Sequence, residues 1–402
     1  MMDILNVKNR LKEMDLPLCL GNILFFIFIF IVMGDPTNSI LHKKDIVFVL
    51  VVAYNIVVFK PDWSKLPYIL LVMAAVIVPW LTSTIAMTPM DPEEALAALK
   101  SISPMILLLW VRNYDLINLS RGPVVICCII LTIIYIAMLV NPLIESVVWA
   151  FTNEHDSTIM MVRRSFLGIK IFACYIKSCV SFLFVFAYYI LGLMKKTQNS
   201  ILYWVIMAFL VFTFMVSGTR STMLAPFFIF IVIAFRVFRN SKKLKYIMIP
   251  VTLLIAIAFV SVIVAAIMET DEYSNVIKYG HLTSYATLLD ENPMYLIFGQ
   301  GPGTSFYSEG FNEIVFKTEW SYLELIRCYG IMSLLIVYVY WRPLITFWKL
   351  RRTNDFTYCM FWTYLAYLMI AGTNPLLISS TGMLILLMAY SYEEKAKRQS
   401  SI

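Results

Sequence analysis

The chain has 402 residues, of which 60% are hydrophobic and 14% charged, and its mean hydropathy is +0.79. Soluble domains carry roughly 25% charged residues, so this composition excludes a soluble globular protein. The net charge of +7 comes from basic clusters between apolar runs. We therefore expect an all-α polytopic membrane protein whose positive charge sets its orientation, and no nucleic-acid partner.

Apolar runs long enough to cross a bilayer as helices follow one another along the whole chain. We interpret residues 1–402 as a single membrane-embedded domain with about 12 transmembrane helices. The first run follows basic residues and is not followed by a small-residue cleavage site, which predicts an uncleaved span. The predicted spans cover 16–33, 45–59, 67–87, 96–111, 123–140, 169–192, 201–216, 221–235, 246–268, 320–340, 356–371 and 376–390.

The distribution of basic residues selects an orientation. With both termini in the cytoplasm, roughly two thirds of the 32 lysines and arginines fall in cytoplasmic segments, as the positive-inside rule requires. Two outer segments are then long: 141–168, and 269–319 between spans nine and ten. Within the larger loop, residues 272–289 are predicted to form an amphipathic helix along the membrane interface.

Familiar catalytic motifs of soluble enzymes are missing. The chain contains three histidines and no HExxH, GxSxG or Walker sequence, which argues against a metalloprotease, a serine hydrolase and an ATP-driven pump. We expect no metal site and no cofactor. The glycine-rich residues 299–303 follow no strand of a βαβ unit, so we interpret them as a structural turn.

One arginine stands in a short turn between two predicted spans, in the sequence VSGTRSTMLAP at residues 216–226. A charge at membrane depth is costly and tends to be paired or functional. On one interpretation, Arg220 caps the carbonyls of the preceding span. On the other, its guanidinium, neighbouring hydroxyls and the N-terminus of the next span bind a diphosphate.

Other ionisable residues lie in the outer loops. Arg163 and Arg164 close the smaller loop, either as solvated or headgroup-binding residues or as part of a substrate site. Lys278 and His281 are three residues apart on the predicted interfacial helix. A packed polar role is the default for His281, and ligand binding is the alternative.

The segment KTEWSYLELIRCYGI, residues 317–331, opens span ten. Helical spacing brings Glu319, Tyr322 and Arg327 onto adjoining faces near the outer mouth. A carboxylate tuned by burial and a nearby arginine suits a general base, for which Glu319 is our candidate. The alternative is an intrahelical pairing of Glu324 or Glu319 with Arg327 that only helps the span insert.

Three motifs together resemble the O-antigen polymerase and O-antigen ligase superfamily of bacterial inner-membrane glycosyltransferases. They are SGTRSTMLAP, then GHLTSYATLLDENPMYLIFGQGPGTSF in the large loop, then TEWSYLELIRCYGI. The resemblance covers residues 217–331, whereas the first 200 residues are similar only in being hydrophobic spans. The ligases carry a histidine at the position that Glu319 occupies when Tyr322 is aligned, so the carboxylate favours the polymerases.

The resemblance implies metal-independent glycosyl transfer on the periplasmic face of the inner membrane. Donor and acceptor would be undecaprenyl-diphosphate-linked oligosaccharides, with a chain-length regulator protein as a further partner. Glu319 would act as the base and Arg220 would contact the diphosphate. Two other functions stay open: an O-antigen ligase and a flippase for lipid-linked oligosaccharides. The residues expected to bind substrate are Arg163, Arg164, Lys278, His281, Tyr322 and Arg327.

Overall fold

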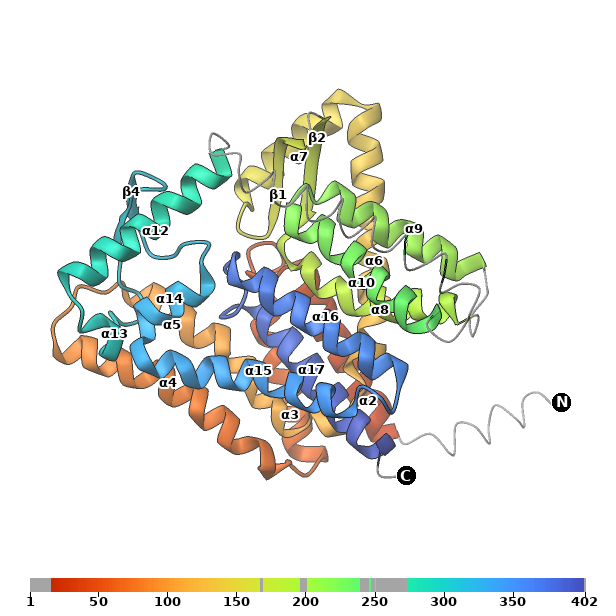
Figure 1. Ribbon diagram of the computed structural model, residues 1–402, viewed down its shortest axis with the longest axis horizontal. Helices are drawn as coiled ribbons and strands as arrows, with labels where there is room; N and C mark the ends of the chain where they lie inside the picture. Colours follow the sequence, from red (N-terminus) through yellow and green to blue (C-terminus); the bar gives the residue numbers. More distant parts are fainter. Residues whose placement is uncertain are drawn as a thin grey trace.

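The computed structural model describes residues 16–166, 169–195, 201–238 and 273–400, together with positions 246 and 250. Nearly all of the predicted span at 246–268 lies outside the described residues. Within them, α-helices dominate and the named strands form two short hairpins (Figure 1).

The N-terminal part is helical, but the predicted span at 96–111 is not a continuous α-helix. Helix α5 ends at Ile102, and a 3₁₀ helix, η2, follows. Pro104 explains the break, because proline lacks an N–H and disfavours helical geometry in the residue before it. The elements here are α2 (Leu16–Gly34), α3 (Lys44–Val58), η1 (Trp63–Lys65), α4 (Leu66–Ile85), α5 (Pro92–Ile102), η2 (Ser103–Leu109), η3 (Val111–Asn113) and α6 (Leu116–Val140).

The predicted outer loop at 141–168 and the start of the predicted span at 169–192 form a structured unit. Helix α7 (Pro142–Glu154) precedes an antiparallel hairpin of β1 (Ile159–Phe166) and β2 (Ile169–Ile176). The apolar run at 169–176 is therefore a strand, and the predicted start of span six is wrong. The helical part begins with η4 (Lys177–Ser181) and continues as α8 (Phe182–Met194).

In the C-terminal part, the helical segment Ser321–Leu350 is interrupted once, at Gly330. Gly330 adopts a φ of 53° between α14 and α15, where an added Cβ would lie 2.4 Å from the carbonyl oxygen of Ile297. The elements are α9 (Ile201–Val216), α10 (Arg220–Phe238), α12 (Tyr273–Glu291), α13 (Tyr295–Phe298), β3 (Phe306–Ser308), β4 (Glu313–Val315), α14 (Ser321–Tyr329), η5 (Gly330–Met332), α15 (Ser333–Leu350), α16 (Asp355–Gly372) and α17 (Ser380–Ser400).

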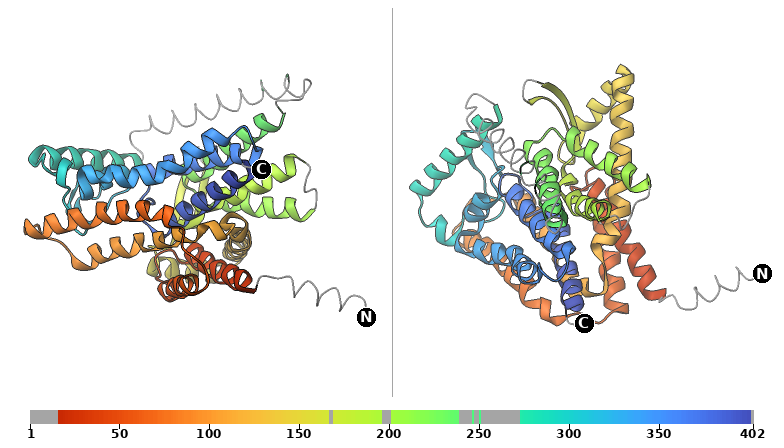
Figure 2. Two further views of the ribbon diagram at one scale, coloured as in Figure 1. Left: turned by 90° about the horizontal axis from the view of Figure 1, so that it is seen from below. Right: turned by 45° about the vertical axis from the view of Figure 1, so that its right-hand side comes forward.

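Helix α17 forms the centre of the molecule. Its side chains from Ser380 to Glu393 are buried, and it packs against α15, α6, α2 and the two 3₁₀ helices η2 and η3. Helix α16 packs against α15, α8 and α10. Figures 1 and 2 show α12, α13, α14, α4 and α5 gathered at one end, with α7 and the β1–β2 hairpin on another side.

Six helical segments among the described residues are long and apolar enough to cross a membrane. Many of their large apolar side chains face outward, as expected for surfaces that contact lipid. The chain is thus a helical membrane protein. The six segments are Leu16–Gly34, Trp63–Ile85, Leu116–Val140, Lys177–Met194, Arg220–Phe238 and Ser321–Leu350.

Candidate functional site

A buried ion pair fixes α14 to the segments around it. The Arg327 side chain is 1% exposed, and its Nε lies 3.1 Å from Oε2 of Glu324, one helical turn earlier. Arg327 also donates to Gln300 Oε1 at 2.6 Å and to the carbonyls of Thr304 and Phe316 at 3.1 and 2.8 Å. Arg327, predicted to bind substrate, instead uses its guanidinium within the protein, as the alternative of an intrahelical pair with Glu324 implies.

The glycine-rich turn at residues 299–303 packs against two helices. An added Cβ would lie 2.2 Å from Ser83 Oγ at Gly301, and 2.5 Å from the carbonyl oxygen of Asp91 at Gly303. Both glycines have positive φ, of 93° and 81°, which side chains disfavour. The turn therefore lies in close contact with α4 and with the start of α5.

Helix α12 supplies a further partner to Glu324. The hydroxyl of Tyr285 donates to Glu324 Oε2 at 2.6 Å and lies 2.5 Å from Thr318 Oγ1. Burial raises the pKa of Tyr285 well above its usual range, so the hydroxyl stays protonated and donates. Cys328 Sγ also approaches Glu324 Oε1, at 3.3 Å. With these donors and Arg327, both oxygens of the Glu324 carboxylate are already held by hydrogen bonds within the protein.

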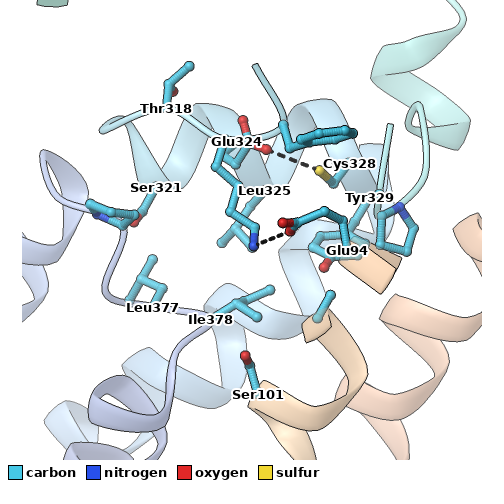
Figure 3. Close-up of a pocket in the computed structure, with 16 residues that line it drawn as sticks. Glu94, Ser101, Thr318, Ser321, Glu324, Leu325, Cys328, Tyr329, Leu377 and Ile378 are labelled. Atoms are coloured by element: carbon cyan, nitrogen blue, oxygen red, sulfur yellow. Dashed lines mark hydrogen bonds and ion pairs between the residues drawn. The ribbon is translucent and has the colours of Figure 1, made fainter. Parts of the chain in front are cut away.

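Beside this cluster lies a cavity of about 90 Å³ between α5, the glycine turn, residues 316–318, α14 and residues 375–378 (Figure 3). Lys317 Nζ and Glu94 Oε2 form an ion pair of 2.7 Å across it. We call it the α5–α14 pocket. Its polar side chains belong to Glu94, Ser101, Lys317, Thr318, Ser321 and Glu324, and its apolar ones include Ala98, Phe316, Leu325, Leu377 and Ile378.

Two residues singled out in the sequence meet next to this pocket. Glu319 directly precedes α14, with its side chain 41% exposed, and its Oε2 lies 3.7 Å from Nζ of Lys278 on α12. The indole of Trp320 donates to the Lys278 carbonyl at 3.1 Å. Glu319 is thus an accessible carboxylate in a loose ion pair with Lys278, rather than a carboxylate buried in an apolar mouth.

His281 and Tyr322 both pack inside the protein. His281 is fully buried, with Nδ1 2.8 Å from Ser308 Oγ and its ring edge-on to Phe311. Burial lowers the pKa of His281 and favours the neutral ring. The Tyr322 hydroxyl donates to the carbonyl of Leu368 in α16 at 3.2 Å. His281 thus packs α12 against the β3–β4 hairpin, and Tyr322 joins α14 to α16.

Arg220 is the first residue of α10 and is partly exposed. The preceding Gly218 has a φ of 60°, and the Thr219 hydroxyl donates to Thr222 Oγ1 at 2.6 Å. The Ser217 hydroxyl donates instead to the Phe214 carbonyl, at the end of α9. Arg220 thus stands at a helix N-terminus, the position that the diphosphate hypothesis requires.

Arg163 and Arg164 belong to β1, opposite Phe172 and Ile171 of β2. They lie on a regular hairpin rather than on an irregular loop.

Several polar residues near the site carry no recognisable signal in the sequence. Lys177 is the first residue of the helical segment Lys177–Met194, directly after β2; it is exposed and lies within electrostatic range of Asp156 and Glu319. Glu94 lies just before the predicted span at 96–111, and Tyr285 lies within the predicted interfacial helix at 272–289. No local motif marks them, because their partners lie far away in the sequence.

Among the residues that the structure describes, no three His, Cys, Asp or Glu side chains are grouped so that they could hold a metal ion. No family model matches the chain, and no curated protein matches it. The fold and site define a polytopic helical membrane protein with a pocket of mixed polar and apolar lining at one end of its helix bundle.

Proposed function

We propose that the chain is a glycosyltransferase of the O-antigen polymerase type, joining undecaprenyl-diphosphate-linked repeat units on the periplasmic face of a bacterial inner membrane. The observation that carries this proposal is Arg220 at the N-terminus of α10, within the SGTR segment. Backbone N–H groups at a helix N-terminus favour anions, and a guanidinium adds two parallel donors. This combination suits the diphosphate of a lipid-linked donor.

A carboxylate near α14 serves as the base. Glu324 is a poor choice, because Arg327, Tyr285 and Cys328 already donate to its oxygens. Glu319 has its oxygen at 3.7 Å from Lys278 and a partly exposed side chain, so a substrate hydroxyl can reach it. A general base must lie within hydrogen-bonding reach of the substrate hydroxyl before its proton affinity can affect the rate.

The reaction then follows from these roles. A hydroxyl at the non-reducing end of the acceptor attacks the anomeric carbon of the donor, and Glu319 takes the hydroxyl proton. The bond between the anomeric carbon and the diphosphate oxygen breaks, and its electron pair leaves with the diphosphate. Arg220 stabilises the charge that gathers there, an effect that is often the largest in catalysis. Arg163, Arg164 and Lys278 are the candidate assisting cations.

The proposed topology has about twelve spans with both termini in the cytoplasm, which makes residues 141–168 and 269–319 periplasmic. Ion pairs support it, because basic residues assigned to the cytoplasmic side meet acidic partners at one end of the bundle. Lys65 pairs with Glu394 at 2.6 Å, and Lys395 pairs with Asp115 at 2.6 Å. Both ion pairs therefore join segments that are assigned to the cytoplasmic side.

Two substitutions test the assignment in cells that make the polysaccharide. Arg220→Lys keeps the charge but loses the planar fork, and Glu319→Gln keeps the shape but loses the base. Each is expected to lower long-chain polysaccharide at least about a hundredfold, the lower bound for one general base or one charge-stabilising donor. Gel analysis of the glycan ladder measures the loss, with membrane levels of the protein checked by immunoblot.

Matched controls are available on the same chain. Arg352→Lys and Glu313→Gln change exposed residues away from α10 and α14, and both should leave the ladder unchanged. Normal ladders from Arg220→Lys and Glu319→Gln would contradict the assigned roles.

The glycan pattern of a deletion strain separates the other functions. A single repeat left on the lipopolysaccharide core indicates a polymerase. Loss of every repeat with lipid-linked polymer accumulating on the periplasmic face indicates a ligase, and lipid-linked single repeats retained on the cytoplasmic face indicate a flippase.

A further inference from the structure

We infer that the α5–α14 pocket binds the terminal sugar of the acceptor and that this sugar is uncharged. The inference rests on the proposed function and adds to it a binding site made of residues that no motif marks. It concerns Glu94, Ser101 and Lys317 above all: α5 supplies the first two (Figure 3), and Lys317, more than 200 residues later, lines the same pocket.

The position of the pocket relative to Glu319 is the first argument. Thr318 and Ser321 line the pocket and flank Glu319 in the chain, so the pocket wall and the candidate base belong to one short segment. A ring held against Thr318 and Ser321 has its hydroxyls beside that segment. The acceptor hydroxyl is the group that Glu319 must reach, whereas the donor's diphosphate belongs with Arg220.

The charge balance of the pocket is the second argument. The charged side chains that line it are Glu94, Lys317 and Glu324; Glu94 pairs with Lys317 at 2.7 Å, and Glu324 pairs at 3.1 Å with Arg327, which is buried behind the wall. No unpaired charge therefore faces the pocket to attract an acidic or amino sugar. It offers hydroxyls and carboxylate oxygens for the edge of a neutral sugar and apolar side chains for its C–H face, the usual composition of a ligand site.

The rigidity of the walls is the third argument. Asp91 N–H donates to the Gly303 carbonyl at 2.8 Å, and Met90 forms a β-bridge with Thr304, which together fix the start of α5 against the glycine turn. Arg327 holds the opposite wall. By contrast, Lys317 and Glu94 are 55% and 34% exposed, so their pairing is weak enough to be exchanged for hydroxyls of a ligand.

The first experiment measures occupancy of the pocket directly. The probe is the oligosaccharide released by mild acid from the lipid-linked repeat that accumulates in a strain lacking this chain. Ser101→Cys places a thiol in the pocket of the purified full-length protein, and its reaction with a small methanethiosulfonate is followed. We expect the oligosaccharide to slow this reaction at least about fivefold, and to leave Glu93→Cys, on the exposed side of α5, unaffected.

The second experiment fills the pocket. Ala98→Phe should raise KM for the lipid-linked acceptor at least about tenfold with little change in kcat, because it removes binding made equally in the ground and transition states. Leu96→Phe, on the same helix but 50% exposed, is the matched control and should change neither value.

The outcomes distinguish a failure of the pocket assignment from a failure of the proposed function. If the oligosaccharide does not slow the modification of Ser101→Cys, the pocket assignment is overturned. It is also overturned if Ala98→Phe leaves the acceptor KM unchanged or raises only the donor KM. In each case the proposed polymerase function stands. A deletion strain that does not leave a single repeat on the lipopolysaccharide core overturns the proposed function, and the pocket assignment falls with it.

Discussion

Arg327 makes more hydrogen bonds than an ion pair within one helix requires. Its guanidinium contacts Glu324 on α14, Gln300 and Thr304 in the glycine turn, and the Phe316 carbonyl before α14. A buried charge gains little over an apolar side chain unless its hydrogen bonds are complete. Here they are spread over three segments, so the residue determines how the large outer loop docks on the helices.

Replacing Arg327 with methionine should therefore destabilise the protein strongly. Glu324 would be left without its cationic partner, and breaking a buried pair in this way costs about 3–5 kcal/mol. Thermal unfolding of the purified protein, followed by tryptophan fluorescence, measures the effect. Lys317→Met breaks the exposed pair with Glu94 and should cost less than about 1 kcal/mol. Equal losses for the two variants would refute the central role of Arg327.

The same residues show how far the sequence predicts the site. The pairing of Glu324 with Arg327 follows from a spacing of three in a helix, so the sequence alone offers it as an alternative to substrate binding. Tyr285 lies 39 residues from Glu324, and Glu94 lies 223 residues from Lys317. Only the tertiary fold brings these partners together, and no local motif signals it.

At the scale of elements, apolar runs do not specify their own conformation. Residues 169–176 were predicted to begin a transmembrane helix, but they form β2, and all eight of them pair with β1. A short apolar run fits a strand and a buried helix equally by periodicity. Residues 272–289 were predicted to form a helix, and α12 covers 273–289 of them, although its apolar side chains lie on both faces, with Val276 exposed and Ile277 buried.

The docking of α5 depends on one glycine. Gly303→Ala would force a side chain into positive φ, at a cost of about 1–3 kcal/mol, and place its Cβ 2.5 Å from the Asp91 carbonyl. We expect a lower unfolding temperature and a disturbed α5–α14 pocket, seen as faster modification of a thiol placed at Ser101. Gly34→Ala is the control, since an added Cβ there meets nothing within 4 Å. An unchanged unfolding temperature and thiol reactivity in the Gly303→Ala protein would show that the turn can shift to accept a Cβ.

At the scale of the whole molecule, ion pairs bring together the ends of segments that the charge distribution assigns to the cytoplasm. Arg342 of α15 pairs with buried Glu393 of α17 at 2.8 Å, and Arg236 of α10 pairs with Asp355 of α16 at 2.8 Å. The α5–α14 pocket is built from other segments, those assigned to the outer side. Basic residues on one side and a polar pocket on the other give the bundle two chemically different ends.

The orientation of these two ends can be tested with single cysteines. Glu313→Cys lies in β4, in the large outer loop, and Thr353→Cys lies between α15 and α16; both positions are exposed. Because the positive-inside rule puts the basic end in the cytoplasm, a membrane-impermeant maleimide should label Glu313→Cys in spheroplasts. Thr353→Cys should be labelled only after the membrane is permeabilised.

The native chain serves as the background for this labelling. Of its cysteines, those at 127, 128, 174, 179, 328 and 359 are buried, and Cys19 is only partly exposed within the apolar helix α2, so the unmodified protein should react slowly. Labelling of Thr353→Cys from outside, with Glu313→Cys protected, would invert the orientation. The α5–α14 pocket and Glu319 would then face the cytoplasm, where a periplasmic polymerase could not use them.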